Sequence, residues 1–371
     1  MVELWRAGGP GSLHPASAAA AAEAEGWDGQ SFMDSQSLGA DPYVLMAHWA
    51  EHTERLMLAT GVTNPLSRHP VAIAAAAATL QATSGERHVL GLGRGDSALA
   101  YLGSGPTPLR RFEQALRDIQ ALLRGQEVTF AAEPTGGDEA RPIRSLSLGD
   151  RPEAAQLRWL PPDLAKVPLD VAASGPKVIA MAARIAERVT FSVGASAERV
   201  GWALELARKA RAEAGLAGQP ISYGLQIPVV CHRDGDTIRE AATRIVMPLA
   251  RFQIMERATA AGPGDPADKR AYDAIRRGYD MTKHSDFSHD KLIGERVDFG
   301  FIRRFAVVGD PEQCTAQILA LAGLGIDRFV VVGPGLIPDG RPEGSLFTDE
   351  VIPAVRAATS VSSGPAIHDG P

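Results

Sequence analysis

One stretch, residues 64–103, constrains the fold of this chain more than any other. It opens with a polar loop, continues with an alanine-rich run that starts at Pro70, and then has the short apolar run Val89–Leu92. Proline suits the first turn of a helix, because that turn makes no use of the missing N–H, and Ile73 begins an apolar face at helical spacing. The stretch therefore predicts a loop, a helix and a buried strand, followed by a glycine-rich loop whose backbone can approach a ligand.

Strand-like and helix-like segments alternate through most of the chain. Nine segments have the composition of strands: 2–6, 31–33, 56–63, 89–92, 168–172, 189–193, 221–231, 305–308 and 329–332. The clearest helical pattern is Leu109–Leu123, which has one apolar stripe. Repeated strand–helix units imply parallel strands joined by right-handed crossovers. Because no change in composition marks a linker, the pattern predicts an α/β fold, a closed (β/α)₈ TIM barrel, rather than an open sheet.

Two segments interrupt this alternation and predict insertions after the fourth and seventh strands. Residues 126–167 are rich in Gly, Pro and Glu without lasting periodicity, which indicates an insertion or a lid. Residues 261–302 are irregular or loosely helical and indicate a second insertion. We therefore expect a single barrel domain over residues 1–345, followed over residues 346–371 by a C-terminal helix and a flexible tail.

Composition excludes several classes of function. The 371 residues carry a net charge of −6 and no run of Lys or Arg, which argues against nucleic acid as a partner. The longest uncharged apolar stretch, Val71–Leu80, is far shorter than the roughly 20 residues of a membrane helix. The first residues lack the pattern of a signal peptide, and the two cysteines form no Cys-x-x-Cys motif. These features predict a soluble cytoplasmic protein.

Polar residues at the ends of the strands are the first candidates for chemistry, because the active sites of TIM barrels lie at the C-terminal ends of the strands. Asp34 and Gln36 follow the second strand, and His69 lies in the loop after the third. We predict these three as catalytic candidates, although His69 could instead hydrogen-bond only its own loop. His284, in the second insertion, could close over a substrate or lie at the surface.

A phosphate site is predicted where Ser174, Gly175 and Pro176 open a helix after a strand. Free N–H groups and the helix dipole favour an anion there, and Gly194 would let a second backbone segment approach the same anion. The alternative is ordinary turn chemistry.

Two further motifs carry other interpretations. The pattern Gly93-x-Gly95-x-x-Ala98 formally fits a dinucleotide-binding fingerprint, with Glu113 as its acidic residue. Prolines soon after it interrupt the helix that such a fingerprint needs. His48, Glu51 and His52 match the inverted zinc-protease motif His-x-x-Glu-His. Their helix precedes a barrel strand and should lie on the outer ring, so we predict no metal site.

Several segments together resemble the luciferase-like flavin and deazaflavin oxidoreductases, especially the branch around methylenetetrahydromethanopterin reductase. These segments are 63–70, 84–87, 90–97, 172–176 and 305–311, in order, and the resemblance spans roughly residues 27–335. It implies a (β/α)₈ barrel that binds FMN or coenzyme F420 at its C-terminal face and often pairs as a homodimer. Some deazaflavin enzymes of the family place a His directly after the acidic residue of the second strand, whereas Ser35 follows Asp34 here.

The resemblance implies an oxidoreductase that moves a hydride between F420 and a small organic substrate. Two alternatives stay open: an FMN-dependent monooxygenase that uses O2 and a separate flavin reductase, and a non-catalytic flavin-binding protein. A bulge with a non-prolyl cis peptide is implied between Gly61 and Asn64. The implied cofactor-binding residues are Val62, Thr63, Asn64, Gly93, Arg94, Ser174, Gly175, Pro176 and Gly194.

Overall fold

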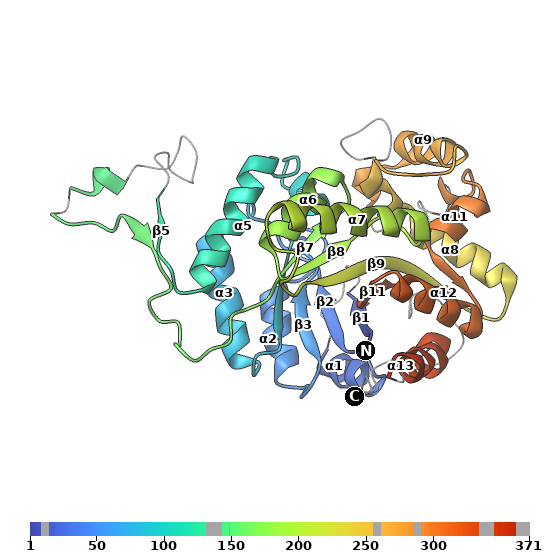
Figure 1. Cartoon of the computed structure of the whole chain (residues 1–371), viewed down its shortest axis with the longest axis horizontal. Helices are drawn as coiled ribbons and strands as arrows, with labels where there is room; N and C mark the ends of the chain where they lie inside the picture. The colour runs from blue at the N-terminus through green and yellow to red at the C-terminus, as the bar shows by residue number, and fades with distance from the viewer. Residues whose placement is uncertain are drawn as a thin grey trace, which may run out of the picture.

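A closed parallel barrel forms the centre of the molecule (Figure 1). The structure is a computed structural model, and it describes residues 1–8, 15–130, 143–147, 149–254, 261–284, 291, 293–333 and 345–360. Eight described strands close the barrel, each paired in parallel with two neighbours. In order around the barrel they are β1 (Glu3–Ala7), β2 (Gly29–Phe32), β3 (Met57–Thr60), β4 (His88–Leu92), β7 (Leu169–Ala173), β8 (Arg188–Phe191), β9 (Ser222–Cys231) and β11 (Arg328–Val332). The predicted TIM barrel is confirmed, and the open dinucleotide-binding sheet is excluded.

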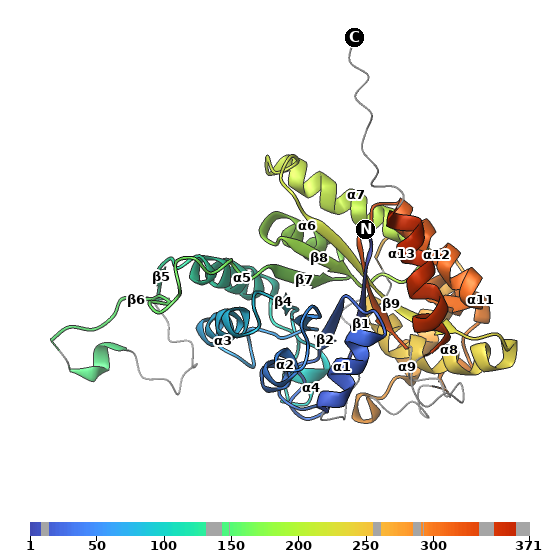
Figure 2. The same ribbon diagram turned by 90° about the horizontal axis from the view of Figure 1, so that it is seen from below.

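Helices surround the barrel and connect its strands (Figure 2). The outer helices are α1 (Ala16–Ala24), α2 (Pro42–Ala50), α3 (Pro70–Thr83), α5 (Leu109–Leu123), α6 (Pro176–Ile185), α7 (Ala197–Glu213), α8 (Gly235–Ala250), α12 (Pro311–Gly323) and α13 (Ile352–Ser360). Pro70 and Pro176 stand in the first turns of α3 and α6, as helix geometry favours. A π-helix, η5 (Phe347–Val351), leads into α13. In the described part of the chain no helix is long and apolar enough to cross a membrane.

One of the nine predicted strands, the eighth along the chain, lies outside the barrel ring. It is β10 (Val307–Gly309), and it pairs with residues 229–231 at the far end of β9. The sequence placed this strand at 305–308, but Phe305 ends helix α11 (Phe299–Phe305). β9 is long enough to pair with β8 and β11 through its first half and with β10 beyond them.

The two insertions differ in where they lie. The described part of the first carries the hairpin of β5 (Val128–Thr129) and β6 (Ala154–Ala155) and the short helix η2 (Ile143–Leu146). It projects from the side of the barrel as an arm (Figures 1 and 2). The second insertion begins earlier than the predicted residue 261, because η3 (Arg251–Gln253) follows α8 directly and precedes α9 (Asp268–Gly278), η4 (Met281–Lys283) and α11. Its apolar residues join those of α8 in a separate core cluster.

Alternation along the strands separates the main core from the barrel interior. On β1, Leu4 packs outward in the large core under the helices, whereas Trp5 packs inward with Val89 and Val330. Gly29 on β2 makes room for Trp5, because a Cβ at this glycine would lie 2.4 Å from the indole ring. The indole ring of Trp5 thus fills the interior of the barrel between β1, β4 and β11.

An ionic group fills the N-terminal end of the barrel. The guanidinium of Arg328, 1% exposed, donates to Asp170 (2.8 Å) and Thr190 (2.9 Å). Arg188 donates to Glu3 at 2.6 Å beside it. These charged groups pair with one another inside the barrel, and a large cavity lies at the other end of the barrel.

Candidate functional site

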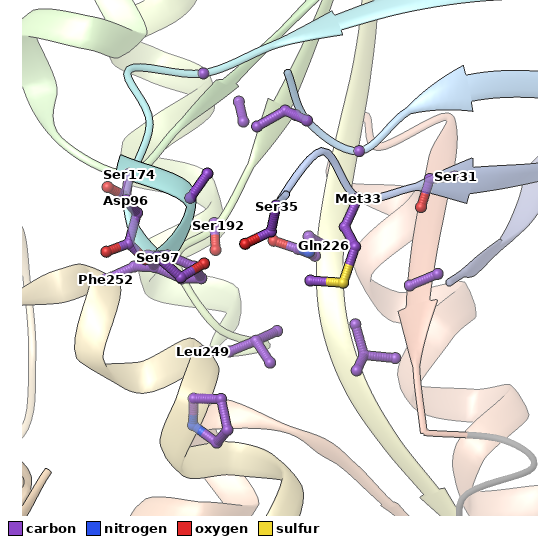
Figure 3. A pocket seen from close by; sticks show the side chains of 18 of the residues that line it. Ser31, Met33, Ser35, Asp96, Ser97, Ser174, Ser192, Gln226, Leu249 and Phe252 are labelled. Carbon is purple, nitrogen blue, oxygen red and sulfur yellow. The ribbon is translucent and has the colours of Figure 1, made fainter. Parts of the chain in front are cut away.

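A cavity of about 590 Å³ opens at the C-terminal end of the barrel (Figure 3). Its floor consists of inward-facing residues near the ends of the strands, and these are Ala7, Ser31, Ala172, Ser192, Gln226 and Val332. Its walls are the loops that follow β2, β3, β4 and β7, and its roof is the end of α8 together with η3 and His284. This is the end at which barrel enzymes hold their substrates and cofactors, and the volume suits a small-molecule site.

Asp34 ties the loop after β2 to the loop after β3. Its buried carboxylate accepts hydrogen bonds from Thr63 Oγ1 (2.6 Å), Arg68 Nε (2.8 Å) and Gln36 Nε2 (2.7 Å). Its hydrogen bond with Arg68 is the main reason that the pKa of this arginine is raised, although partial burial opposes the shift. Asp34 lines the cavity, whereas Gln36 is exposed and contacts the site only by its hydrogen bond to Asp34.

The end of β3 forms the wall at which a cofactor ring was expected. The peptide bond between Gly61 and Val62 is cis, so the predicted non-prolyl cis peptide is confirmed. Gly61, Val62 and Asn64 line the cavity, whereas Thr63 is turned to Asp34 and fully buried.

The side-chain amide of Asn64 has an oxygen that is hydrogen-bonded within the loop and a nitrogen that has no partner among the described residues. Its Oδ1 accepts the backbone N–H groups of Leu66 (3.1 Å) and Ser67 (2.9 Å). Its Nδ2 is buried and has no hydrogen-bond partner among the described residues, and the same holds for Ser35 Oγ. A buried polar group without a partner is destabilising, so two such groups in one cavity wall indicate a ligand.

The loop after β4 approaches the β3 wall closely. A Cβ at Gly93 would lie 2.7 Å from the Val62 side chain, and Gly95 has a φ of +81°. Only glycine fits the first position without displacing Val62, and glycine is favoured at the second. Arg94 also lines the cavity, with its Nε donating to the carbonyl of Thr107 (2.7 Å).

Helix α6 begins at the cavity edge, next to Ser174 and Gly175. Gly175 is the N-cap residue, and no side chain caps this end of the helix. The first-turn N–H groups of an uncapped helix attract an anion, which keeps the predicted phosphate position compatible with the structure. Pro176 stands in the first turn without lining the cavity.

His69 and Gly194, like Gln36, Thr63 and Pro176, are absent from the cavity lining. His69 is exposed and caps α3, with its Nδ1 accepting the N–H of Val71 (3.2 Å). Gly194 packs against Phe305, and a Cβ there would lie 2.8 Å from that ring. Their position after a strand does not tell these residues from those that line the cavity, because the direction of a loop side chain depends on tertiary packing.

The roof brings in Arg251, which the sequence pattern did not single out. Asp96, from the loop after β4, forms an ion pair with Arg251 of η3. Burial opposes the charge of Arg251, but the hydrogen bond and charge of Asp96 outweigh it and raise the pKa of the guanidinium. Tyr101 adds a second link, donating to the carbonyl of Met281 (2.8 Å). The loop after β4 and the second insertion therefore meet across the cavity.

His284 lines the cavity from this roof, and its Nδ1 lies 2.5 Å from Tyr279 Oη. Burial, followed by the nearby charge of Arg251, lowers the pKa of His284 to about 4. The imidazole is therefore neutral near pH 7. The described residues of the arm contribute nothing to the cavity lining.

The histidine pair on α2 lies elsewhere. His48, Glu51 and His52 are exposed, and their ligand atoms lie within 4.8 Å of one another. None of the three lines the cavity, which agrees with the predicted place of this helix on the outer ring.

Comparison with known proteins places the chain in a family. Over 337 residues it is 25% identical to 5,10-methylenetetrahydromethanopterin reductase of Methanolobus tindarius, covering 89% of this chain and 93% of that one. It is 27% identical to F420-dependent glucose-6-phosphate dehydrogenase of Microbacterium testaceum over 82% of this chain and 80% of the relative. The solved F420-dependent tetrahydromethanopterin reductase of Methanopyrus kandleri shares the fold, with a TM-score of 0.71, 21% identity and coverage of 95% and 99%. The family model for luciferase-like monooxygenases matches residues 13–328. This chain therefore belongs to the luciferase-like monooxygenase family.

Proposed function

We propose that this chain is an oxidoreductase that transfers a hydride between coenzyme F420 and a small organic substrate. The observation that carries the proposal is the cavity wall, where the buried Asn64 Nδ2, the glycine approach at Gly93 and the uncapped end of α6 adjoin one opening. Together they offer a hydrogen-bond donor, room for a ring and a position for a phosphate. The F420-dependent dehydrogenase among the relatives supports F420 as the cofactor.

The residues present fit such a cofactor. Val62, Asn64 and Gly93 would hold its ring system, and Ser174 with Gly175 would hold its phosphate. When bound, the deazaflavin supplies the hydride. The roof, closed by Asp96 and Arg251, would exclude water from the reacting atoms.

Among the catalytic candidates, Asp34 is assigned to positioning. Its oxygens already accept from Thr63, Arg68 and Gln36, so its main effect is to fix the loops after β2 and β3. His69 is not retained, because it caps a helix at an exposed position. His284 is the described histidine that lines the cavity and is the better candidate for a hydrogen bond to substrate.

The second candidate function is an FMN-dependent monooxygenase supplied by a separate flavin reductase. The description of the matching family model as luciferase-like monooxygenase favours it. FMN also carries a ring system and a phosphate, so the same wall and the same end of α6 would hold it.

Titration of the apo-protein with F420 and with FMN tests the proposal. We expect F420 to bind at least about tenfold more tightly, which corresponds to about 1.4 kcal/mol. Tighter binding of FMN would favour the monooxygenase, and binding of neither would remove the proposed function. Absence of turnover with a broad substrate panel and bound, reduced cofactor would instead indicate a non-catalytic binding protein.

A further inference from the structure

Part of the cavity lining forms an apolar wall, made mainly by the end of α8 and by η3. Six of its residues are hydrophobic, from β11, the loop after β2, α8 and η3, and these are Met33, Ile245, Pro248, Leu249, Phe252 and Val332. Figure 3 shows Leu249 across the open space from Ser35 and Gln226. A substrate bound here would therefore place most of its surface in contact with apolar side chains.

Four of the polar groups that line the cavity are uncharged. They are the hydroxyls of Ser35, Ser97 and Ser192 and the amide of Gln226. Ser35 Oγ is buried and without a hydrogen-bond partner in the described part of the chain. His284 joins this neutral group, because its lowered pKa leaves the imidazole uncharged near pH 7. Such groups can bind an oxygen atom of a ligand without supplying a counter-charge.

The charged groups of the described lining are already engaged with protein partners. Arg251 is paired with Asp96, and Asp34 with Arg68. Arg6 donates to Gln30 Oε1 at 2.6 Å, and Arg94 donates through its Nε to the carbonyl of Thr107 at 2.7 Å. An anionic substrate in this space would have to compete with Asp96, with Gln30 or with the Thr107 carbonyl for a guanidinium, and separating the buried pair of Arg251 and Asp96 leaves a charge uncompensated.

We infer that the substrate is a neutral, largely apolar carbonyl compound or the corresponding alcohol, rather than a carboxylate or a phosphate ester. This inference rests on the proposed function. In the reductive direction, the carbonyl carbon gains a hydride from the reduced deazaflavin, and the carbonyl oxygen takes a proton from solvent. An alcohol forms, and the cofactor is oxidised by two electrons. Ser35 and Gln226 position the carbonyl oxygen, and the apolar wall holds the remainder.

Acetophenone and phenylglyoxylate provide a matched test, because both are phenyl ketones and differ by a methyl group against a carboxylate. Isothermal titration of each into the protein, with and without oxidised F420, gives their affinities without turnover. We expect acetophenone to bind at least about tenfold more tightly and to be the ketone that oxidises F420H2. Equal or tighter binding of phenylglyoxylate, or binding of neither ketone, would overturn the inference.

Failure of this inference and failure of the proposed function give different results. If F420 binds but acetophenone does not, the substrate class is wrong and the cofactor assignment stands. If F420 does not bind, the proposed function fails first. The two titrations are therefore independent measurements.

Leu249 offers a variant that should change the preference. Leu249→Lys places an ammonium group in the apolar wall, and we expect it to shift the affinity ratio toward phenylglyoxylate by about tenfold or more. Leu249→Met keeps the volume and the apolar character and should preserve the ratio. A ratio unchanged by lysine in a protein that still binds F420 would contradict the role of this wall. If the lysine variant does not fold, the wild-type ratio decides alone.

Discussion

Asn64 shows how one side chain can serve both the fold and a ligand. Asn64 lines the cavity; its Oδ1 caps the turn that follows β3, and its buried Nδ2 has no partner among the described residues. The turn explains why an amide or a carboxylate is suited to this position, but only an amide also donates. We assign the free donor to the cofactor.

Asn64→Asp separates these two roles. The carboxylate keeps the acceptor for Leu66 and Ser67 but loses the unpartnered Nδ2 donor. We expect F420 affinity to fall by about tenfold or more, since a lost hydrogen bond and an unsatisfied group cost about 1–3 kcal/mol. Fluorescence titration measures the affinity, and a melting curve close to that of the wild type confirms the fold. Undiminished affinity would assign Nδ2 no part in binding.

His88 is a buried residue with a titratable ring that the proposed function does not use. It is 0% exposed, its Nδ1 lies 2.9 Å from the carbonyl of Leu58, and burial lowers its pKa to about 4. The unfolded chain takes up this proton near pH 6.5, whereas the folded chain does not. The group therefore contributes stability above pH 6.5 that is lost as the pH falls toward 4.

His88→Asn should reduce this acid sensitivity. The asparagine can still donate near Leu58 but does not titrate. Between pH 6.5 and 4, the free energy of unfolding should fall by roughly 3 kcal/mol less in the variant than in the wild type. Urea denaturation at a series of pH values measures both slopes. Parallel pH profiles would show that His88 ionises in the folded state as it does in the unfolded one.

At the scale of secondary-structure elements, the ends of helices determine what the loops can do. α3 and α6 both start with proline after a barrel strand, but His69 caps α3, while no side chain caps α6. The N–H groups of α3 are thus partly satisfied by its own loop, and those of α6 remain for an anion. Two loops with similar sequence patterns therefore differ in their capacity to bind an anion.

Gly175→Asp should weaken cofactor binding by at least about tenfold, because it places a carboxylate where a phosphate is expected. Gly175 has a φ of −117°, which any residue can adopt, so backbone strain is not the cause. Gly175→Asn, of the same shape but uncharged, is the matched control and should lose less affinity. Calorimetric titration with F420 decides between them, and equal losses would point to bulk rather than charge.

The exposed cluster on α2 should have no part in activity. His48→Ala removes one of its three ligand atoms without touching the cavity. We expect less than stoichiometric zinc in the purified protein, and cofactor affinity and turnover equal to those of the wild type in the variant. Elemental analysis with one zinc per chain, lost together with activity in the variant, would contradict this assignment.

At the scale of the whole molecule, barrel closure brings loops far apart in the sequence around one opening. Asp96 and Arg251 meet because the fourth-strand loop and the second insertion share the same end of the barrel. The arm lies on the side instead and carries the exposed aromatic residues Phe130 (44%) and Trp159 (51%). Exposed aromatic side chains on a projecting hairpin are compatible with contact to a second copy.

We predict that the protein is a homodimer or a larger homo-oligomer in solution, as its resemblance to the family implies. Light scattering coupled to size exclusion, at micromolar concentration, measures the mass. A value near the 39.2 kDa of one chain would contradict the prediction. Trp159→Ser tests separately whether the arm contributes, since it should shift the mass toward the monomer only if the arm lies in the contact.

The sequence by itself determined the barrel, its two insertions and the loops that carry the site. Hydrophobic periodicity and glycine positions are local properties, so the sequence alone can show them. The apolar run Val89–Leu92 predicts a buried strand, and Gly93 predicts a close approach of the backbone, which Val62 makes in the structure. The cis peptide after Gly61 was also foreseen, through resemblance to the family.

Only the tertiary structure decided which side chains enter the cavity. His69 and His284 both lay in loops of the expected face, but His69 bonds to its own helix, and His284 reaches the cavity from the roof. Arg251 and Asp96 lie 155 positions apart, and no local pattern predicts their ion pair. Side-chain direction in a loop and pairing across a barrel depend on how distant segments pack, and that information is not contained in local periodicity.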